Sequence, residues 1–309
     1  MRKLPILVKD EIAPLEVVVL GIAEDFGGKP SFEEAYDPKS KEHIKAGTFP
    51  LEKDLIKEMD AFNDVFEKYN VEVYRPENIE NYNQIFCRDI AFVIDNKFII
   101  PNILDKRARE FQAISAIVDQ IDPNLIVKMP EGACVEGGDV MPWGDFIFVG
   151  VSDEKDFQNY TVARTNYAGV EFLQRTFPER TVVSFELNKS DVDPRDNALH
   201  LDCCFQPIGK GQAVIYPCGF KHKEDVQFLV DYFGEENIIE ITKNEMYHMN
   251  SNLFSIRPEV IVSEKKSTRL NDELRRRGFT VEEIPYAEIC KMEGSLRCST
   301  LPLRRKYNG

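Results

Sequence analysis

The chain has 309 residues and carries 39 lysines and arginines against 53 aspartates and glutamates, a formal net charge of −14. This acidic balance argues against a surface for duplex DNA or anionic membranes, because both need a positive face. The N-terminal apolar run, residues 4–8, is far too short for a secretion signal or a membrane span, so we expect a cytoplasmic protein that binds neither nucleic acid nor membrane.

The seven cysteines form an odd set with no pair spaced as Cys-x-x-Cys, which excludes a disulfide framework and a zinc ribbon. In a reducing compartment most such cysteines are small buried hydrophobic residues, although one of them can still be a nucleophile. The four histidines, at positions 43, 200, 222 and 248, are few enough to narrow the search for a catalytic base. We expect neither a metal nor another cofactor.

Helices are predicted where apolar residues recur at three- and four-residue intervals, and each such stretch is followed by a short strand-like run. The expected helices lie near residues 51–69, 106–121, 161–177, 224–233 and 268–277. The strand-like runs cover residues 71–74, 125–127, 181–185, 237–241 and 279–284.

Between each strand and the next helix, the chain repeats one layout: a polar residue, an apolar strand, a turn and a second apolar strand. The hairpins begin at Asp89, Asp139, Asp202 and Asn252, and the first two are expected to turn at residues 95–96 and 144–145. These polar heads are 50, 63 and 50 residues apart, and 46 more residues lead to Cys298 at the head of a short apolar run. So few residues follow this run that its partner strand has to be the N-terminal segment 15–20, which closes a ring.

A repeat of this size is typical of radial architectures such as propellers, in which the strand heads point at a common axis. The spacing therefore favours one ring of five modules over two separate domains. An ordinary mixed α/β sheet with coincidental hairpins is the alternative that spacing alone leaves open.

Cys298 follows a glycine-containing loop, stands next to Arg297 and begins a strand. We expect its thiol to be exposed, and the neighbouring cation to lower its pKa and so raise the thiolate fraction that a nucleophile needs. A buried loop cysteine is the structural alternative.

Further candidates stand at the other repeat heads. His200 and Asp202 are two apart on a strand-like run, which places a base and a carboxylate on the same side. Glu136 and Asp139 enclose two glycines in a turn, and Asp89 opens the first hairpin. Considered singly, these residues are also consistent with a core histidine, a metal pair, a polar turn or a surface ion pair.

Because all of these residues fall at repeat heads, one shared site is favoured over separate accidents. A cysteine, a histidine and several carboxylates make a strongly anionic pocket, which suits a cationic electrophile. A guanidinium group fits, because carboxylates can bind its edges through parallel hydrogen bonds.

The same residues resemble the guanidine-modifying enzymes of the pentein superfamily, which include arginine deiminases, dimethylarginine hydrolases and arginine:glycine amidinotransferases. The resemblance covers nearly all of the chain and implies a five-bladed α/β propeller of ββαβ-type modules, with residues 1–309 forming a single catalytic domain. It rests on Phe86-Cys-Arg-Asp89, Glu136-Gly-Gly-Asp139, Arg164-Thr165, His200-Leu-Asp202, Asn252 and Cys298-Ser-Thr-Leu-Pro-Leu-Arg304.

Carried over position by position, the resemblance makes Cys298 the nucleophile and His200 the general acid and base. Glu136 would orient and charge the imidazole. Asp89 and Asp202 would clamp the guanidinium group of the substrate.

Three further residues are assigned to substrate binding on the same resemblance. Asp139 is expected to support the pocket from just behind, and Arg164 is of the kind that holds a substrate α-carboxylate in arginine deiminases. Asn252, before the fourth hairpin, also reads like those enzymes. Asn166–Tyr167 and Arg304–Arg305 read instead like amidinotransferases, so water or an amine as the second-step acceptor stays open.

We expect hydrolysis of free arginine to citrulline and ammonia through a covalent thiouronium intermediate, with transfer of the amidino group to an amine such as glycine as the close alternative. A dimethylarginine hydrolase, an arginine dihydrolase and a non-catalytic binding homologue complete the range. Carboxylates at both Asp89 and Asp202 favour an unsubstituted guanidinium over a methylated one. The expected partner is a small arginine-like molecule, and assembly into a homo-oligomer is left open.

Overall fold

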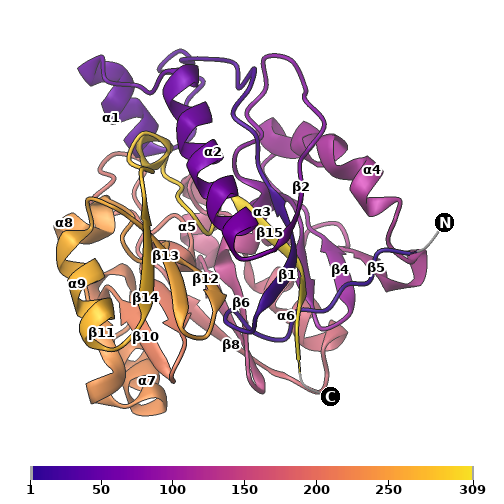
Figure 1. Ribbon diagram of the computed structural model, residues 1–309, viewed down its shortest axis with the longest axis vertical. Helices are drawn as coiled ribbons and strands as arrows, with labels where there is room; N and C mark the ends of the chain where they lie inside the picture. The colour runs from indigo at the N-terminus through magenta and orange to yellow at the C-terminus, as the bar shows by residue number, and fades with distance from the viewer. Residues whose placement is uncertain (1–2, 308–309) are drawn as a thin grey trace.

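The computed structural model describes residues 3–307, and within that range the strands form five three-stranded sheets (Figure 1). In each sheet the middle strand runs antiparallel to one neighbour and parallel to the other. Sheet by sheet, the strands are β15 (Thr300–Arg305), β1 (Leu15–Leu20) and β2 (Glu72–Tyr74); β3 (Phe92–Ile94), β4 (Lys97–Ile100) and β5 (Ile126–Lys128); β6 (Val140–Trp143), β7 (Phe146–Val151) and β8 (Thr181–Glu186); β9 (Phe205–Ile208), β10 (Gln212–Ile215) and β11 (Ile238–Glu240); and β12 (Phe254–Arg257), β13 (Val260–Glu264) and β14 (Thr280–Ile284).

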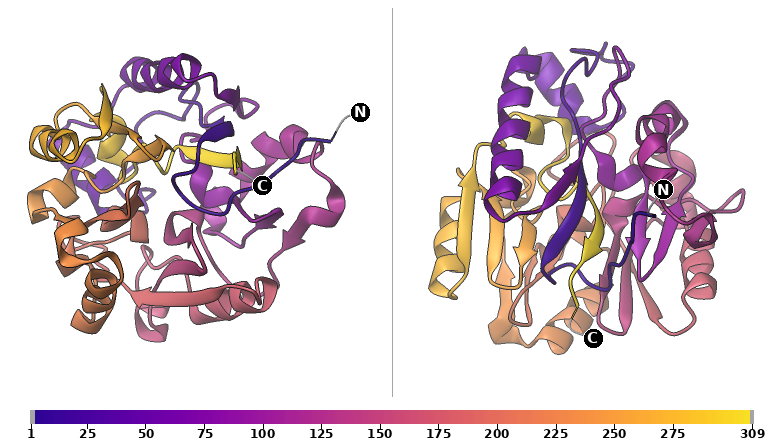
Figure 2. Two further views of the ribbon diagram at one scale, coloured as in Figure 1. Left: turned by 60° about the horizontal axis from the view of Figure 1, so that its bottom comes forward. Right: turned by 45° about the vertical axis from the view of Figure 1, so that its right-hand side comes forward.

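Helices connect the second and third strands of each sheet and lie mainly on the outside (Figures 1 and 2). The α-helices are α1 (Pro38–Ala46), α2 (Glu52–Lys68), α3 (Cys87–Ile90), α4 (Ser115–Val118), α5 (Glu154–Asn159), α6 (Tyr167–Thr176), α7 (Lys223–Phe233), α8 (Lys243–Tyr247) and α9 (Thr268–Arg276). The 3-10 helices are η1 (Asp105–Ile114), η2 (Pro123–Leu125), η3 (Gly137–Asp139), η4 (Leu201–Cys203), η5 (Pro217–Gly219), η6 (Glu235–Asn237) and η7 (Ile289–Met292).

The chain runs round the molecule, and its last strand returns to its first. Figure 2 (left) shows the elements following one another round the middle in chain order. β15 pairs antiparallel with β1, in a register that places Leu20 opposite Thr300 and Leu15 opposite Arg305. The predicted closure by both ends of the chain is therefore confirmed.

The predicted hairpins are also confirmed, and their turns have local causes. β3 and β4 are joined through Asp95, which has φ 51°, and β6 and β7 through Gly144, which has φ 55°. Aspartate, asparagine and glycine adopt this left-handed conformation more readily than other residues, so these two turns fall where the sequence provides them.

Two predicted helices differ from the structure. Residues 106–121 are mostly the 3-10 helix η1, in which the i,i+3 pair Arg107 and Glu110 is eclipsed and joined at 2.8 Å. In residues 161–177 a helix forms only from Tyr167, because Asn166 caps it through the Gly169 N–H. The pattern also missed α1, whose signal is the cap Asp37 followed by a proline.

Aromatic packing fixes α2 to the sheet of β12, β13 and β14. The Phe62 ring stacks on Phe66 at a centroid distance of 4.5 Å and meets Phe254 and Tyr286 edge-on at 5.9 and 5.6 Å. All four side chains are fully buried. Such pairs stabilise a core beyond the area they bury. Within residues 3–307, no helix has the length and apolar composition needed to cross a membrane.

Candidate active site

Apart from Arg164, which lies between α5 and α6, the predicted site residues come shortly before β3, β6, β9, β12 and β15, one strand from each of the five sheets. Each is at least nine-tenths buried: Asp89, Glu136, Asp139, Arg164, His200, Asp202, Asn252 and Cys298. We call the space between them the catalytic cavity; its lining includes Asp89, Arg164, His200 and Cys298. Its volume is about 20 Å³, so the closed site has room for roughly one water molecule.

The Glu136-Gly-Gly-Asp139 turn needs its glycines because other chain segments pack directly against it. A Cβ atom on Gly137 would lie 2.0 Å from the carbonyl oxygen of Arg88, and one on Gly138 would lie 2.5 Å from Nδ1 of His200. The two glycines therefore allow the turn to bring Glu136 and His200 together.

His200 is held through one nitrogen and free at the other. Its Nε2 lies 2.9 Å from Oε2 of Glu136, while Nδ1 is buried without a hydrogen-bond partner in residues 3–307 and lies 3.7 Å from Asp89. Burial by itself lowers the pKa of this imidazole, but the carboxylates of Asp89, Asp139 and Glu136 outweigh burial and raise the pKa of His200 to about 9. His200 is thus protonated at neutral pH, with Nδ1 free to give up its proton.

The backbone around His200 corrects the sequence prediction. Residues 201–203 form the 3-10 helix η4 and not a strand, so His200 and Asp202 are not related by strand alternation. They instead face different partners: His200 binds Glu136, and Asp202 accepts from Arg297 at 2.9 Å.

Two arginines hold the carboxylates at the His200 end of the cavity. Arg107 donates to Asp89 at 2.7 Å, and Arg164 donates through Nη1 to both oxygens of Glu136 at 3.2 and 3.1 Å. Burial alone raises the pKa of Glu136, but Arg164, His200 and Arg107 together hold it well below its usual value. Nη2 of Arg164 is buried with no partner among the described residues, and it is therefore available to a ligand.

The environment of Cys298 differs from the prediction in two respects. The residue is 2% exposed, so its thiol is buried and not open to solvent. Burial, Asp202 and Asp89 raise its pKa well above the ordinary thiol value. Arg297 does not counteract this, because its guanidinium is paired with the carboxylates of Asp202 and Glu11.

Asn252 and Asp202 contact the thiol of Cys298. Asn252 donates through Nδ2 to Sγ of Cys298 at 3.1 Å and accepts through Oδ1 from the backbone N–H of Arg297 at 2.9 Å. An oxygen of Asp202 lies 3.6 Å from the same sulfur. Asp139 lies behind this layer, where it accepts from Thr165 at 2.7 Å and from the Leu201 N–H at 2.8 Å.

Arg297 was not among the predicted site residues, yet it joins several of them. It is 0% exposed, and its Nη1 donates to Asp202 at 2.9 Å and to the carbonyl oxygen of Gly138 at 3.3 Å. Its Nη2 donates to the Val140 carbonyl at 2.7 Å, and Glu11 accepts from Nη2 and Nε at 3.0 and 3.1 Å. One planar group thus ties the Glu136 turn, η4 and the segment that precedes Cys298 together.

The carboxylates near His200 also form a geometric group of metal-binding type. Ligand atoms of Asp89, Glu136 and His200 lie within 4.8 Å of one another. Arg107 and Arg164, however, donate to the same two carboxylates. A cation placed there would face two buried guanidinium groups, so we assign the group to an ion-pair network.

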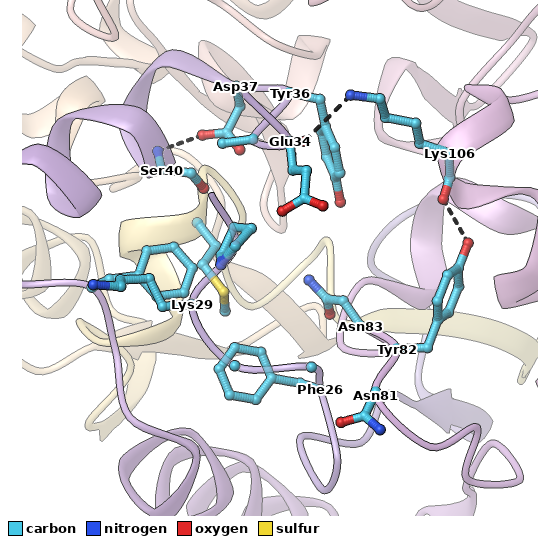
Figure 3. Close-up of a pocket in the computed structure, with 16 residues that line it drawn as sticks. Phe26, Lys29, Glu34, Tyr36, Asp37, Ser40, Asn81, Tyr82, Asn83 and Lys106 are labelled. Carbon is cyan, nitrogen blue, oxygen red and sulfur yellow. Dashed lines mark hydrogen bonds between the residues drawn. The ribbon is translucent and has the colours of Figure 1, made fainter. Parts of the chain in front are cut away.

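A larger space, which we call the outer chamber, adjoins the catalytic cavity. Its volume is about 450 Å³, and it shares Tyr36, Asp37 and Met292 with that cavity. Figure 3 shows the Glu34 carboxylate and the Tyr36 hydroxyl pointing into the space above Asn83. The outer chamber therefore provides an approach from the surface towards Cys298.

Sequence reasoning missed the acidic wall between these two spaces. Asp37 and Glu293 both line the catalytic cavity. Burial and the nearby Asp37 raise the pKa of Glu293 well above its usual value, and Asn197 donates to Glu293 at 2.6 Å. The sequence marks Asp37 only as the residue before Pro38, which is a typical helix cap position and not a sign of a functional site.

Comparisons with known proteins match residues 35–305 to the family described as N,N dimethylarginine dimethylhydrolase, eukaryotic. YkgA of Bacillus subtilis (strain 168) is 28% identical over 244 residues, which cover 76% of this chain and 78% of YkgA. An arginine deiminase of Oenococcus oeni is 23% identical over 264 residues, which cover 72% of this chain and 61% of the deiminase. The chain thus spans less than two thirds of that deiminase.

Among solved structures, SxtG, an amidinotransferase of the saxitoxin biosynthetic pathway in Microseira wollei, matches with a TM-score of 0.75 and 19% identity. The match covers 99% of this chain and 98% of SxtG, and at this identity it establishes the fold alone. The matched family, the arginine deiminase and SxtG belong to the pentein superfamily, so the resemblance expected from the motifs is confirmed.

Proposed function

The chain belongs to the family of N,N dimethylarginine dimethylhydrolase, eukaryotic, within the pentein superfamily, and on that premise we propose that it hydrolyses the guanidino group of free arginine to citrulline and ammonia. One observation carries the proposal. Residues as far apart in sequence as Asp89, His200 and Cys298 line a single buried cavity, and Nδ1 of His200 has no hydrogen-bond partner among the described residues.

In the first step the substrate itself activates the nucleophile. Burial, Asp202 and Asp89 raise the pKa of Cys298 in the free enzyme, and a bound guanidinium cation offsets these carboxylates and favours loss of the thiol proton to solvent. The thiolate Sγ then bonds to the central guanidine carbon. His200 gives its proton to one terminal nitrogen, the carbon–nitrogen bond breaks, and ammonia leaves a cationic thiouronium on Cys298.

In the second step the now neutral His200 takes a proton from water. The resulting hydroxide bonds to the same carbon, the carbon–sulfur bond breaks, and the new hydroxyl group loses its proton to solvent, which releases neutral citrulline and restores the thiolate. Glu136, 2.9 Å from Nε2, stabilises the imidazolium in both steps. Asp89 and Asp202 stabilise positive charge where an acyl-transfer enzyme would stabilise an oxyanion.

Arg164 supports an amino-acid substrate. Its Nη2 is a buried donor without a partner in residues 3–307, and the other nitrogen of its fork is bound to Glu136. A substrate α-carboxylate would satisfy this donor. The closed cavity is too small for arginine. Tyr36 and Met292 line both this cavity and the outer chamber, so they have to move apart for the substrate to enter.

Dimethylarginine is the second candidate substrate, and the family match favours it. Apolar side chains of Phe86, Leu199 and Met292 line the same cavity as the carboxylates and offer surface to methyl groups. The chemistry would be the same, with dimethylamine as the leaving group instead of ammonia.

The deciding experiment is incubation with L-arginine or with dimethylarginine, each with and without glycine, followed by assays for citrulline, ammonia, dimethylamine and ornithine. We expect citrulline and ammonia from arginine alone, and none from a Cys298→Ser control. Citrulline only from dimethylarginine identifies the second candidate. Ornithine that depends on glycine identifies amidino transfer, and ornithine with ammonia but without glycine identifies a dihydrolase; either result rejects the deiminase proposal.

A labelling experiment tests the covalent mechanism separately. A haloacetamidine, which carries a guanidinium-like cation, should alkylate Cys298 faster than an uncharged haloacetamide, and arginine should protect the thiol. Equal rates for both reagents, with no protection, would exclude a site built for a guanidinium.

We further propose that the five sheets are the blades of a five-bladed α/β propeller of ββαβ-type modules and that residues 1–309 act as one catalytic domain. The closure of the ring by β1 and β15 supports this arrangement. All seven cysteines are free thiols in the described chain, which supports a cytoplasmic location.

A further inference from the structure

A separate cavity lies beside the amino end of α9, away from the outer chamber. We call it the α9 cavity; its volume is about 370 Å³, and its lining includes His248, Glu264, Lys266, Thr268 and Cys290. Small-molecule sites typically occupy about 300–1,000 Å³. None of these lining residues takes part in the proposed reaction.

Glu264 brings an unsatisfied acceptor to this cavity. The residue is 7% exposed, and its Oε1 has no hydrogen-bond partner in residues 3–307, whereas Oε2 accepts from the backbone N–H of Lys266. A buried carboxylate oxygen without a donor is costly, so this position calls for a ligand that carries hydrogen-bond donors and positive charge.

The opposite charge preference lies only a few residues away. No side chain of the described residues caps the amino end of the nine-residue helix α9, although Ser267 occupies the cap position. The first helical residues, Thr268 and Arg269, line the cavity together with Lys266. Arg269 is already bound to Glu245 at 2.6 and 2.8 Å, so the helix end and Lys266 remain for an anion.

We propose that the α9 cavity is a binding site for a free α-amino acid. Its ammonium group donates to Oε1 of Glu264, and its carboxylate accepts from the amino end of α9 and from Lys266. The unpaired charges of the cavity, one positive and one negative, match those of a zwitterion. A simple amine would leave the helix end unused, and a simple carboxylate would leave Glu264 without a donor.

The position of this site matters because one short segment borders both cavities. Cys290 in η7 lines the α9 cavity, while Met292, Glu293 and Gly294 line the catalytic cavity and lead on to Cys298. An amino acid bound at α9 therefore contacts the segment that carries the nucleophile. The inference goes beyond the proposed function and holds whether or not the chain hydrolyses arginine.

The test is hydrogen–deuterium exchange of the whole chain with millimolar glycine, L-leucine or L-ornithine, none of which has a guanidine. We expect at least one of them to slow exchange in residues 264–271 and 287–292. Because the amide oxygen of a glutamine side chain can still accept from the Lys266 N–H, Glu264→Gln should fold normally but weaken binding at least about tenfold, measured by calorimetry. Lys266→Met should weaken it as well.

Glu240→Gln, on a nearby exposed glutamate, is the matched control and should bind like the wild type. No protection by any of the three amino acids would overturn the proposal, and so would full binding by Glu264→Gln. Methylammonium or acetate that binds as tightly as glycine would show that a single charge suffices and would reject the amino-acid assignment.

Discussion

The centre of the ring and its exterior use charged residues in opposite ways. At the centre, Arg297 is 0% exposed and every nitrogen of its guanidinium has an acceptor. On the exterior, the pair Lys57–Asp54 on α2 has side chains 72% and 36% exposed. Buried pairs are strongly coupled and fix geometry, whereas exposed pairs are screened by water and salt. The acidic net charge thus mainly describes the exterior, and the site depends on the few charges inside.

The largest effect is expected where this central network meets the reacting atom. Cys298→Ser should lower kcat at least about 10⁴-fold, because the hydroxyl is a far weaker nucleophile, while the binding of arginine persists. Steady-state kinetics and calorimetry measure the two effects. Turnover near that of the wild type would refute a covalent intermediate.

The apolar layer between centre and exterior should affect stability and not chemistry. Phe62→Ala removes a ring that contacts Phe66 and Phe254, and it should cost about 3–5 kcal/mol of unfolding free energy in a denaturant titration. At denaturant concentrations below the unfolding midpoint of the variant, kcat should stay unchanged. Lys57→Ala on the same helix is the matched control, with an expected cost below about 0.5 kcal/mol. If both variants lose the same unfolding free energy, the buried apolar residues do not stabilise the fold more than the exposed charged residues.

Glu136→Gln tests whether central charge sets the proton chemistry. The pKa of His200 is raised to about 9 by its carboxylate partners, so removing one of them should move it down towards 6.5. His200 acts as an acid only while it is protonated. As the pH rises, the variant should therefore lose activity at a lower pH than the wild type. We expect kcat at neutral pH to fall about 100-fold. The measurement is the pH dependence of kcat. If kcat of the variant falls at the same basic pH as kcat of the wild type, Glu136 does not have this electrostatic role.

The smallest effect is expected for Arg297→Lys, which keeps the charge but loses the fork. Because a single ammonium group cannot hold Asp202 and Glu11 together, kcat should fall about tenfold with little change in KM. Arg304→Lys, whose half-buried partner is Glu16, is the control and should behave like the wild type. If the two variants are equally active, Arg297 does not position the site.

The repeated hairpins and the ring closure could be predicted because each depends on local signals. Alternating apolar residues and turn formers such as Asp95 and Gly144 act within a few positions. The grouping of Asp89, Glu136, His200 and Cys298 followed from their equivalent places in the repeats. The family resemblance then assigned roles that geometry alone could not.

The electrostatics could not be predicted, because they depend on burial and on side-chain direction. Arg297 is next to Cys298 in sequence, yet its charge is paired with Glu11 and Asp202, and the thiol pKa rises instead of falling. Arg107 is in a stretch with helical periodicity, and only the tighter 3-10 turn aims it at Asp89. The contact between Arg297 and Glu11 joins segments 286 residues apart, which no local pattern reveals.

The pairing of β1 with β15 has a consequence for circular permutation of the chain. The Lys9 N–H donates to the Tyr307 hydroxyl at 2.6 Å, so the segment that leads into β1 lies beside the end of β15, whereas Leu4 lies further off and is bonded to Gln120. We expect that a linker from Tyr307 to the segment before Lys9, with a new opening in an exposed loop such as the one around Val192, 88% exposed, would keep every sheet pairing. A chain permuted in this way should then form the same five sheets, with its modules in a different order along the sequence.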